Sequence, residues 1–333
     1  MPTVLIVPEA MRDVPGPYVD VLTRAGFDVR YPRNPMLGRN LCSPEELIDE
    51  LSVADASLAS VEGYSADVLA AVPNLKVIAR CGVGYDHVDV SAATEHGIPV
   101  TITPNANHEA VAELALALLF ATTKSIVSND KNVRGGKWTR QPLMPLRGKT
   151  LGIFGLGRIG SSLAYRADAL GMRVIACEKF PNLEFVRSHK IELVDLDTLL
   201  QRSDFVSLHA PHNAETEGLF NRDAFAKMKP GSIFINTSRG PLQVESDLFE
   251  ALTSGHLRAA GLDVFEQEPP SPSNPLFQLD NVVVSPHVAG IDETSIVAMG
   301  VEAAQCIVRL SQGEWPDGSV VNDQLQDTYR WER

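Results

Sequence analysis

The chain has 333 residues, which at roughly 150 residues per domain predicts two domains. Hydrophobic residues make up 44% and charged residues 21%, close to the globular norm, so a disordered or collagen-like chain is excluded. The 29 Lys and Arg are outnumbered by 42 Asp and Glu, and the net charge of -13 means that no nucleic acid or anionic membrane is expected as a partner.

The cysteines and the N-terminal segment indicate the cellular compartment. The N-terminal segment has no basic stretch followed by a signal-type apolar run, and the most apolar stretch, Ala110–Thr122, is shorter than the roughly 20 residues that span a bilayer. The cysteines lie far apart, without the spacing of a zinc site or a disulfide framework, at Cys42, Cys81, Cys177 and Cys306. We therefore expect a cytoplasmic protein with no membrane segment and no bound metal.

The first third of the chain alternates short β-branched runs with helical patterns, which is typical of βαβ units around a parallel sheet. A helix is expected at Pro44–Leu51, and a longer, mostly apolar helix at Asn105–Ala121. The longer helix should be buried on more than one side, as a connector between domains or a subunit interface. The strands of this part are predicted at Thr3–Val7, Asp28–Tyr31, Ala54–Ala59, Val77–Ala79 and Pro99–Thr101.

A second series of strands comes after Lys131–Lys149, whose Arg, Lys, Gly and Pro content predicts a surface loop. After the last strand we expect a helix at Glu293–Leu310 and a polar tail that returns to the first domain. The predicted fold class is α/β with two doubly wound parallel-sheet domains, one (residues 104–290) inserted into the other (residues 1–103 and 291–333). The strands of the inserted domain are predicted at Leu151–Phe154, Arg173–Cys177, Phe205–Leu208, Ser232–Asn236, Ala259–Val264 and Asn281–Val284.

A glycine-rich motif of the form G-x-G-x-x-G lies between the first of these strands and a helix that runs to Leu170. The first glycine permits a tight turn, the second lets the backbone approach a pyrophosphate, and the third allows the helix to pack on the strand. Since the helix N-terminus adds free N–H donors and a partial positive charge, the motif predicts a dinucleotide site. Its residues are Gly155, Leu156, Gly157, Arg158, Ile159 and Gly160.

An acidic residue, Glu178, follows the next strand, 178 − 155 = 23 residues after the first glycine of the motif. Rossmann domains carry an acid about 20 residues on, where it accepts hydrogen bonds from the hydroxyls of the adenosine ribose. A carboxylate there repels the 2′-phosphate of NADP, so NAD is the favoured cofactor. NADP remains the alternative, because the ammonium of Lys179 could pair with that phosphate.

Three residues with reactive side chains, Arg239, Glu268 and His287, each follow one of the later strands. Because ligands of open α/β sheets bind beyond the carboxyl ends of the strands, all three should project from the edge that carries the glycine motif. A histidine, with an ordinary pKa of ~6.5, suits proton exchange with a hydroxyl, and a guanidinium suits two-bond capture of a carboxylate. We predict a site that oxidises a secondary alcohol, with His287 as the base, Glu268 orienting it, and a nicotinamide taking the hydride.

Through these residues and their surroundings the chain resembles the D-isomer-specific 2-hydroxyacid dehydrogenases, nearest in pattern to the short D-3-phosphoglycerate dehydrogenases. The resemblance extends over almost the whole length. The segments that carry it are R-C-G-V-G-Y-D-H-V-D (Arg80–Asp89), T-P-N-A-N-H-E-A-V-A-E (Thr103–Glu113), the glycine motif, L-H-A-P (Leu208–Pro211), I-N-T-S-R-G (Ile235–Gly240), G-L-D-V-F-E-Q-E-P (Gly261–Pro269) and S-P-H-V-A-G (Ser285–Gly290).

The resemblance implies a Rossmann cofactor domain inserted into a flavodoxin-like substrate domain, with the active site in the cleft between them. It implies that Arg239 binds the substrate carboxylate and that His287 and Glu268 form the acid/base couple. Backbone amides near Val83 and Gly84 would also hold the carboxylate. A homodimer built on the long apolar helix is a further implication.

The resemblance also extends to the cofactor side. It puts Asp263 near the nicotinamide carboxamide and Thr237 among the cofactor-binding residues. His209, in L-H-A-P, is expected to line the adenosine side and not to transfer protons, together with Pro211 and Thr216 of the same loop.

One segment departs from the phosphoglycerate enzymes, which carry an arginine in the loop after the third strand of the first domain. Here Ser57–Ser65 reads S-L-A-S-V-E-G-Y-S, with Glu62 and no cation. A phosphorylated substrate would lack a partner and face a like charge, so we expect a small, unphosphorylated 2-hydroxy or 2-keto acid. D-3-phosphoglycerate remains the alternative substrate.

Other proteins share this architecture. A formate dehydrogenase would be expected to carry glutamine in place of Glu268, and a phosphite dehydrogenase a lysine near Val83, so both are disfavoured. An NAD-sensing transcriptional corepressor would keep the three reactive residues and act as a binding module. It needs a peptide groove and usually has long tails, so it is retained only as the alternative from a different class.

Overall fold

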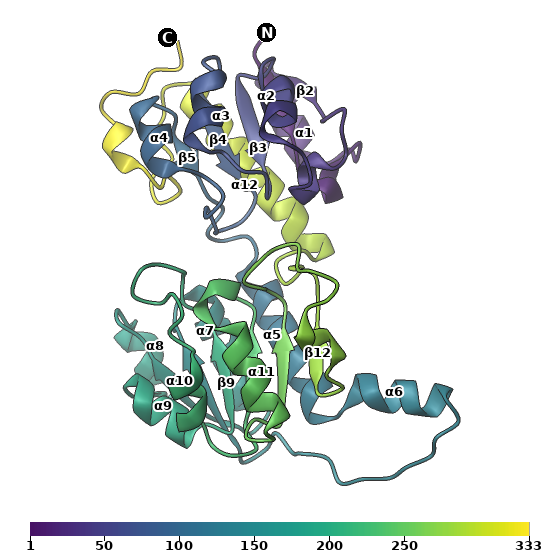
Figure 1. Cartoon of the computed structure of the whole chain (residues 1–333). Helices are drawn as coiled ribbons and strands as arrows, with labels where there is room; N and C mark the ends of the chain where they lie inside the picture. The colour runs from purple at the N-terminus through teal and green to yellow at the C-terminus, as the bar shows by residue number, and fades with distance from the viewer. Residues whose placement is uncertain (333) are drawn as a thin grey trace. The chain divides into compact units, whose positions relative to one another are not determined.

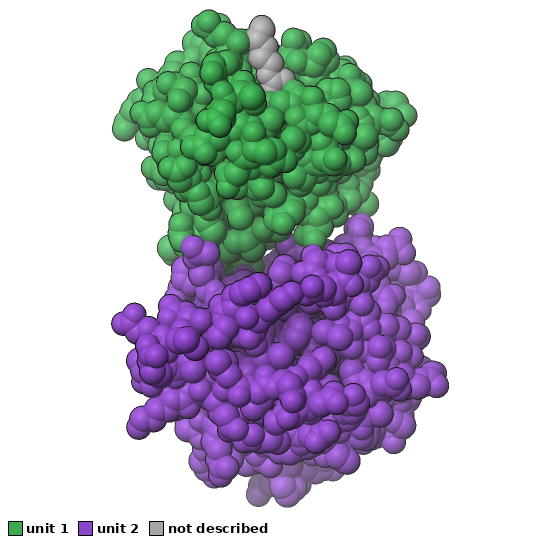
Figure 2. Space-filling view, turned by 90° about the vertical axis from the view of Figure 1, so that its left-hand side faces the viewer, with its two compact units in different colours: residues 1–107, 290–333 green, residues 108–289 purple. Residues whose placement is uncertain are grey.

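The computed structural model describes residues 1–332, and the chain divides into two compact units. Unit 1 comprises residues 1–107 and 290–333, and unit 2 comprises residues 108–289 (Figure 2). Unit 2 is thus inserted into the chain of unit 1. The inserted domain is predicted to comprise residues 104–290, and unit 2 comprises residues 108–289.

Unit 1 is built on a five-stranded parallel sheet in the order β2-β1-β3-β4-β5 (Figure 1). This order is that of flavodoxin-like doubly wound folds, which confirms the fold expected for the substrate domain. Its strands are β1 (Thr3–Ile6), β2 (Asp28–Arg30), β3 (Ala56–Ala59), β4 (Val77–Arg80) and β5 (Val100–Thr101). Its helices are α1 (Pro17–Arg24), α2 (Pro44–Leu51), α3 (Ala66–Ala71), α4 (Val90–Glu95) and α12 (Glu293–Ser311).

The core of unit 1 covers both faces of its sheet. Every residue of β1, β3 and β4 is buried, because a parallel sheet has helices on both sides and leaves no face to solvent. One apolar cluster joins Leu22 of α1 with Ala303 and Ile307 of α12, and another contains Leu47 of α2 and Val68 of α3. Helix α12 therefore packs in the core of unit 1.

Unit 2 is built on a seven-stranded parallel sheet in the order β12-β11-β10-β9-β6-β7-β8. This is the Rossmann order, in which the direction of chain progression reverses between β6 and β9. Its strands are β6 (Thr150–Phe154), β7 (Arg173–Cys177), β8 (Glu192–Leu193), β9 (Phe205–Leu208), β10 (Ile233–Asn236), β11 (Ala259–Leu262) and β12 (Val282–Val284). Its helices are α5 (His108–Thr123), α6 (Ile126–Arg134), α7 (Arg158–Ala169), α8 (Leu183–Ser188), α9 (Leu196–Arg202), α10 (Arg222–Lys227) and α11 (Glu245–Thr253).

The long apolar helix of the sequence, α5, is a core helix of unit 2. Half of its 16 residues are buried, and it packs against α7, β10 and β11, so its expected burial on more than one side is confirmed. The apolar surface that the sequence assigned to a connector or subunit interface is largely covered within the unit. No single helix of the described chain is long and apolar enough to cross a membrane, and α5 with α6 reaches that length only across a bend of 54°.

Helix α6 occupies the start of the stretch that the sequence predicted as a surface loop. It extends away from the rest of unit 2 (Figure 1), and none of its residues is buried. Ile126, Val127 and Val133 on this helix are each more than half exposed, and Trp138 in the loop that follows is 77% exposed. The exposed apolar side chains of this region therefore lie on α6 and its loop, not on α5.

Candidate active site

The glycine motif joins the carboxyl end of β6 to α7, and each of its glycines meets a different environment. Gly155 has φ +95°, and a Cβ there would lie 2.6 Å from the backbone nitrogen of Ala210 after β9. A Cβ on Gly160 would lie 2.0 Å from the carbonyl oxygen of Gly155, whereas a Cβ on Gly157 would meet no atom within 4 Å. The first and third glycines therefore allow close packing, and the second leaves open space where a pyrophosphate can approach the backbone.

Glu178, directly after β7, is tied to this motif. Its Oε2 accepts a hydrogen bond from the amide of Leu156 (2.6 Å), and its Oε1 accepts one from the amide of Phe180 (2.8 Å). Because a carboxylate has about four acceptor positions, both oxygens can still accept from ribose hydroxyls. Arg158 and Ile159 form the first turn of α7, whose free N–H groups and dipole favour an anion.

The loop after β9 carries the three residues predicted to line the adenosine side. The backbone amide of His209 donates to the carbonyl of Phe154 (2.7 Å), and its Nε2 is 2.8 Å from the hydroxyl of Ser207. Burial lowers the pKa of His209 to about 3, which fits the predicted role on the adenosine side and not in proton transfer. The hydroxyl of Thr216 donates to the carbonyl of Pro211 (2.8 Å) and so shapes the loop.

Two buried polar atoms at this sheet edge have no hydrogen-bond partner among the described residues. They are Nδ1 of His209, after β9, and Oγ1 of Thr237, after β10. Buried polar atoms in proteins are nearly always paired, so such atoms indicate a missing ligand or water. Together with the open space at Gly157, they fit a dinucleotide lying along the carboxyl ends of β6, β9 and β10.

His287 and Glu268 lie in contact after the carboxyl ends of β12 and β11. The distance from Nδ1 of His287 to Oε2 of Glu268 is 2.6 Å, and Oε1 of Glu268 accepts from the amide of Phe265 (2.9 Å). Burial alone would raise the pKa of Glu268. The pKa nevertheless lies below its usual value, because burial is outweighed by the hydrogen bond and charge of His287, the Phe265 amide and the charge of Arg239. Glu268 is therefore an ionised acceptor, Nδ1 carries the proton of this bond, and Nε2 of His287 is left for a ligand.

Arg239 is brought to this couple by its neighbour Gly240. A Cβ on Gly240 would lie 1.8 Å from the carbonyl oxygen of Phe265, so the loop after β10 packs backbone to backbone on the loop that leads to Glu268. Only glycine permits this approach. The guanidinium donates from Nη1 to the carbonyl of Ser238 (2.6 Å), and its charge reaches Glu268, as the lowered pKa of that residue indicates.

Asp263 fixes the loop that carries His287, a role that sequence reasoning missed. Its fully buried carboxylate accepts from the hydroxyl of Ser285 (2.6 Å) and from the amides of Val288 (3.0 Å) and Ala289 (2.9 Å). His287 itself has φ +52°, a left-handed conformation that a non-glycine residue adopts only when its surroundings enforce it. An acidic residue directly after an apolar strand is the signal that could have indicated such an anchor. The approach of Asp263 to a nicotinamide carboxamide stays a prediction.

In unit 1, the loop after β4 contains Val83 and Gly84, and its neighbours form a buried polar network. Nε of Arg80 donates to the carbonyl of Gly84 (3.0 Å). Glu62 is only 2% exposed and accepts from the hydroxyl of Tyr64 (2.7 Å). Burial raises the pKa of Glu62, and the charge of Arg80 offsets this only in part. The expectation that Glu62 presents a negative charge to a substrate phosphate is therefore wrong, because its carboxylate is enclosed within unit 1.

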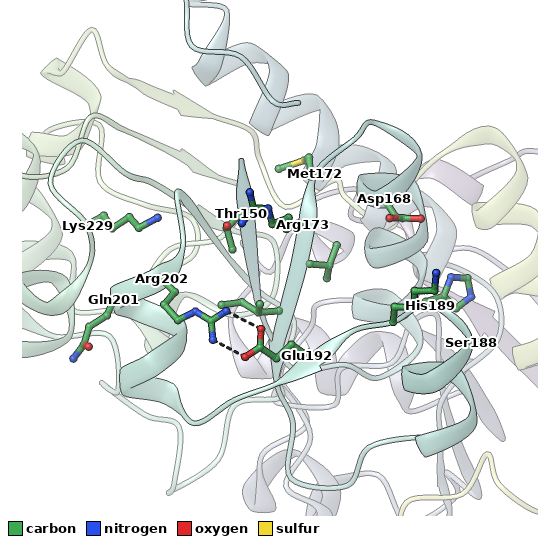
Figure 3. Close-up of a pocket in the computed structure, with 13 residues that line it drawn as sticks. Thr150, Asp168, Met172, Arg173, Ser188, His189, Glu192, Gln201, Arg202 and Lys229 are labelled. Carbon is green, nitrogen blue, oxygen red and sulfur yellow. Dashed lines mark hydrogen bonds and ion pairs between the residues drawn. The ribbon is translucent and has the colours of Figure 1, made fainter. Parts of the chain in front are cut away.

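A cavity of about 760 Å³ lies at the opposite edge of the unit 2 sheet (Figure 3). Thr150 and Arg173, which begin β6 and β7, contribute to its wall, so it lies at the amino ends of the strands, away from the glycine motif. In it, two nitrogens of Arg202 donate to the two carboxylate oxygens of Glu192 at 2.6 and 2.7 Å. The cavity is separate from the candidate active site. No group of three or more His, Cys, Asp or Glu among residues 1–332 could hold a metal ion.

The fold and the site define a dinucleotide-binding α/β protein whose sheet edge carries an acid/base couple beside an arginine. Residues 116–289 match the sequence model of "D-isomer specific 2-hydroxyacid dehydrogenase, NAD binding domain". The chain belongs to the D-isomer specific 2-hydroxyacid dehydrogenase family, and unit 2 contains its NAD-binding domain.

Individual relatives agree with this family. The chain is 43% identical over 274 residues to D-3-phosphoglycerate dehydrogenase of Archaeoglobus fulgidus, an alignment that covers 81% of this chain and 52% of the relative. It thus spans about half the length of that relative. It is 39% identical over 290 residues to glyoxylate reductase of Korarchaeum cryptofilum, covering 85% of this chain and 87% of the relative. D-lactate dehydrogenase from Aquifex aeolicus, solved with NAD and lactic acid, has a TM-score of 0.82 at 26% identity and covers 96% of this chain and 98% of its own.

Proposed function

We propose that the protein oxidises D-2-hydroxy acids, and reduces the corresponding 2-keto acids, with NAD as the hydride carrier. The observation that carries this proposal is the 2.6 Å contact between His287 and Glu268 on the sheet edge that bears the glycine motif. An imidazole held by an ionised carboxylate is suited to taking and returning the proton of a hydroxyl. Arg239, beside this couple, supplies the cation that a carboxylate substrate requires.

The chemistry follows from the roles of these three side chains. Nε2 of His287 takes the hydroxyl proton as C2 of the substrate is oxidised, and Glu268 stabilises the imidazolium that results. Arg239 binds the substrate carboxylate and polarises the developing carbonyl oxygen. Bound NAD supplies the acceptor for the hydride that leaves C2. We propose that the amides near Val83 and Gly84 also bind the substrate carboxylate.

The cofactor would be held by the edge residues described above. The amides of Gly157, Arg158 and Ile159 would bind the pyrophosphate, since no side chain blocks them at Gly157. Glu178 would accept from the ribose hydroxyls, and Thr237 would gain a partner for its unpaired hydroxyl. The remaining contacts, by analogy with the family, would come from Gly155, Gly160, His209, Pro211, Thr216 and Asp263.

For the substrate, we propose a small, unphosphorylated acid, because Ser57–Ser65 supplies no cation for a phosphate. Glyoxylate reductase of Korarchaeum cryptofilum, which matches this chain over 87% of its own length, supports the same choice. A second candidate is D-3-phosphoglycerate, which is favoured by the 43% identity to the Archaeoglobus fulgidus enzyme. The enclosure of Glu62 also favours it, because the expected repulsion between Glu62 and a substrate phosphate is removed.

A panel of 2-keto acids with NADH and NADPH tests the proposal. We expect reduction of glyoxylate, pyruvate or hydroxypyruvate with NADH, and a kcat/KM for D-3-phosphoglycerate oxidation below that for D-glycerate. A large preference for 3-phosphoglycerate would transfer the proposal to the second candidate. Tight binding of a peptide without turnover of any 2-keto acid would instead support the corepressor alternative.

We also propose that the protein is a cytoplasmic homodimer. The exposed apolar side chains of α6 and of the loop after it support a second copy as the partner, because they gather on one segment that projects from unit 2. The four free cysteines support a reducing compartment. Sedimentation of the full chain tests the assembly: the wild type should sediment as a dimer, and Val127→Asp should shift it toward a monomer.

A further inference from the structure

Lys179, the residue that kept NADP open as a cofactor, is engaged by an acid from another loop. Its Nζ lies 3.0 Å from Oε1 and 2.9 Å from Oε2 of Glu215. Glu215 is held in place by its own backbone amide, which donates to Oδ1 of Asn213 (2.9 Å). The ammonium of Lys179 is therefore shared between two carboxylate oxygens in the structure.

The Lys179–Glu215 pair lies next to two residues that are expected to bind the adenosine part of the cofactor. Lys179 directly follows Glu178, the expected partner of the ribose hydroxyls, and Glu215 directly precedes Thr216 in the loop expected to line the adenosine. The pair thus joins the ends of β7 and β9 at the place where the 2′-substituent of an adenosine ribose would lie. NADP differs from NAD only by a phosphate at that position, and this phosphate carries about -1.5 to -2 charges.

We propose that Glu215 is a specificity-determining residue that excludes NADP by occupying Lys179. This inference rests on the proposed NAD site. With Glu215 present, a 2′-phosphate meets two carboxylates, Glu178 and Glu215, and must compete for an ammonium that is already paired. Without Glu215, Lys179 is free to bind the phosphate. NAD has no charge at this position, so its affinity should hardly depend on the pair.

The exposure of the pair sets the size of the effect. The side chains of Lys179 and Glu215 are 64% and 71% exposed, so the pair contributes little to folding and its removal should not unfold the protein. Removing one charge a few ångströms from a phosphate in a largely aqueous setting should change affinity by about 5- to 30-fold.

Calorimetric titration of the full chain with NAD⁺ and NADP⁺ measures this directly, without turnover. We expect Glu215→Gln to lower the Kd of NADP⁺ by about tenfold and to change the Kd of NAD⁺ by less than about twofold. In a Lys179→Met background the same substitution should give a much smaller gain, because no ammonium remains to be released. Glu217→Gln, which removes an exposed charge from the same loop, is the matched control and should change neither Kd by more than about twofold.

Two results would overturn the inference. One is an unchanged Kd for NADP⁺ in Glu215→Gln. The other is an equal gain with and without Lys179, which would point to a general charge effect. Failure of the proposed NAD site is distinguishable from both, since the wild type would then bind neither NAD⁺ nor NADP⁺, and failure of the dehydrogenase activity is read separately from the 2-keto acid panel.

Discussion

Two glutamates, one in each unit, have similar neighbours and opposite properties. Glu62 in unit 1 and Glu268 in unit 2 each accept hydrogen bonds from a nearby backbone amide, and each feels the charge of an arginine. Burial raises the pKa of Glu62, and its neighbours do not reverse this. Burial also raises the pKa of Glu268, but the groups around Glu268 lower it by more, so the pKa lies below its usual value.

The difference lies in the partner and in access to solvent. Glu268 bonds directly to the ring of His287, and the two side chains are 28% and 38% exposed. Glu62 bonds to the neutral hydroxyl of Tyr64, which is itself bonded to Ser57, and all three are buried. A carboxylate ionises more readily where an imidazole donor and water are both within reach. The unit 2 pair is therefore suited to proton transfer, and the unit 1 network to holding a loop.

The largest expected effect comes from removing the histidine of the unit 2 pair. In His287→Ala, kcat should fall by about 10² to 10⁴, because general acid and base assistance is lost. The Kd of NADH should stay within about twofold, since the glycine motif is untouched. Steady-state kinetics and NADH titration measure both, with His256→Ala as control, since His256 lies just before β11, at the amino ends of the strands and away from the motif. Retention of most of the wild-type kcat would move proton transfer to another residue.

The next effect is expected at the arginine that acts on Glu268. In Arg239→Ala, kcat/KM should fall by about 10- to 150-fold, the range for one hydrogen bond to a charged group, with KM raised and kcat lowered. Arg239→Lys keeps the charge but not the two-pronged geometry, so it should recover part of kcat and little of KM. Equal kinetics for the lysine variant and the wild type would contradict a bidentate role.

A smaller effect, on pH dependence, is expected for Glu268→Gln. Because the folded pKa of Glu268 is lowered, its ionised form supports His287 throughout the neutral range, and this support is lost only as the pH falls through that lowered pKa. The glutamine variant lacks the ionised acceptor that orients the ring of His287, so kcat should fall by about tenfold, and kcat/KM should lose the part of its pH dependence that follows the ionisation of Glu268. A pH profile that coincides with the wild type would show that Glu268 does not act through His287.

Much of the fold could be predicted because buried parallel strands are mostly apolar runs, as in Phe205–Leu208, where Ser207 is the one polar residue and the predicted and observed strands coincide. The strand β8 was missed because its two residues, Glu192 and Leu193, are both exposed and carry no apolar pattern. Helix α6 was missed for a related reason, since none of its residues is buried. Elements without a buried face leave little trace in a sequence.

The meeting of His287 with Glu268 could be anticipated, because side chains after neighbouring parallel strands share an edge. Other features depend on contacts between distant segments. Glu62 looked like an exposed loop charge, and only the packing of Tyr64 and Arg80 around it shows that it is enclosed. In the same way, the close approach at Gly240 depends on the backbone of a loop some 25 residues further along the chain.

The smallest effect concerns the stability of unit 1. A carboxyl whose folded pKa is raised contributes stability below its unfolded value, near 4.5, and this contribution is lost as the pH rises through the folded pKa. The free energy of unfolding of unit 1 should therefore decrease across that window by at most about 1.4 kcal/mol per pH unit. Glu62→Gln keeps an acceptor for the Ser60 amide without the charge, so this slope should disappear.

Urea unfolding at several pH values, followed by the fluorescence of Trp315 and Trp331 in a Trp138→Phe background, measures this slope. Glu95→Gln, an exposed acid of the same unit, should keep the wild-type slope, and a Glu62→Gln slope equal to that of the wild type would show that Glu62 titrates as an ordinary surface acid.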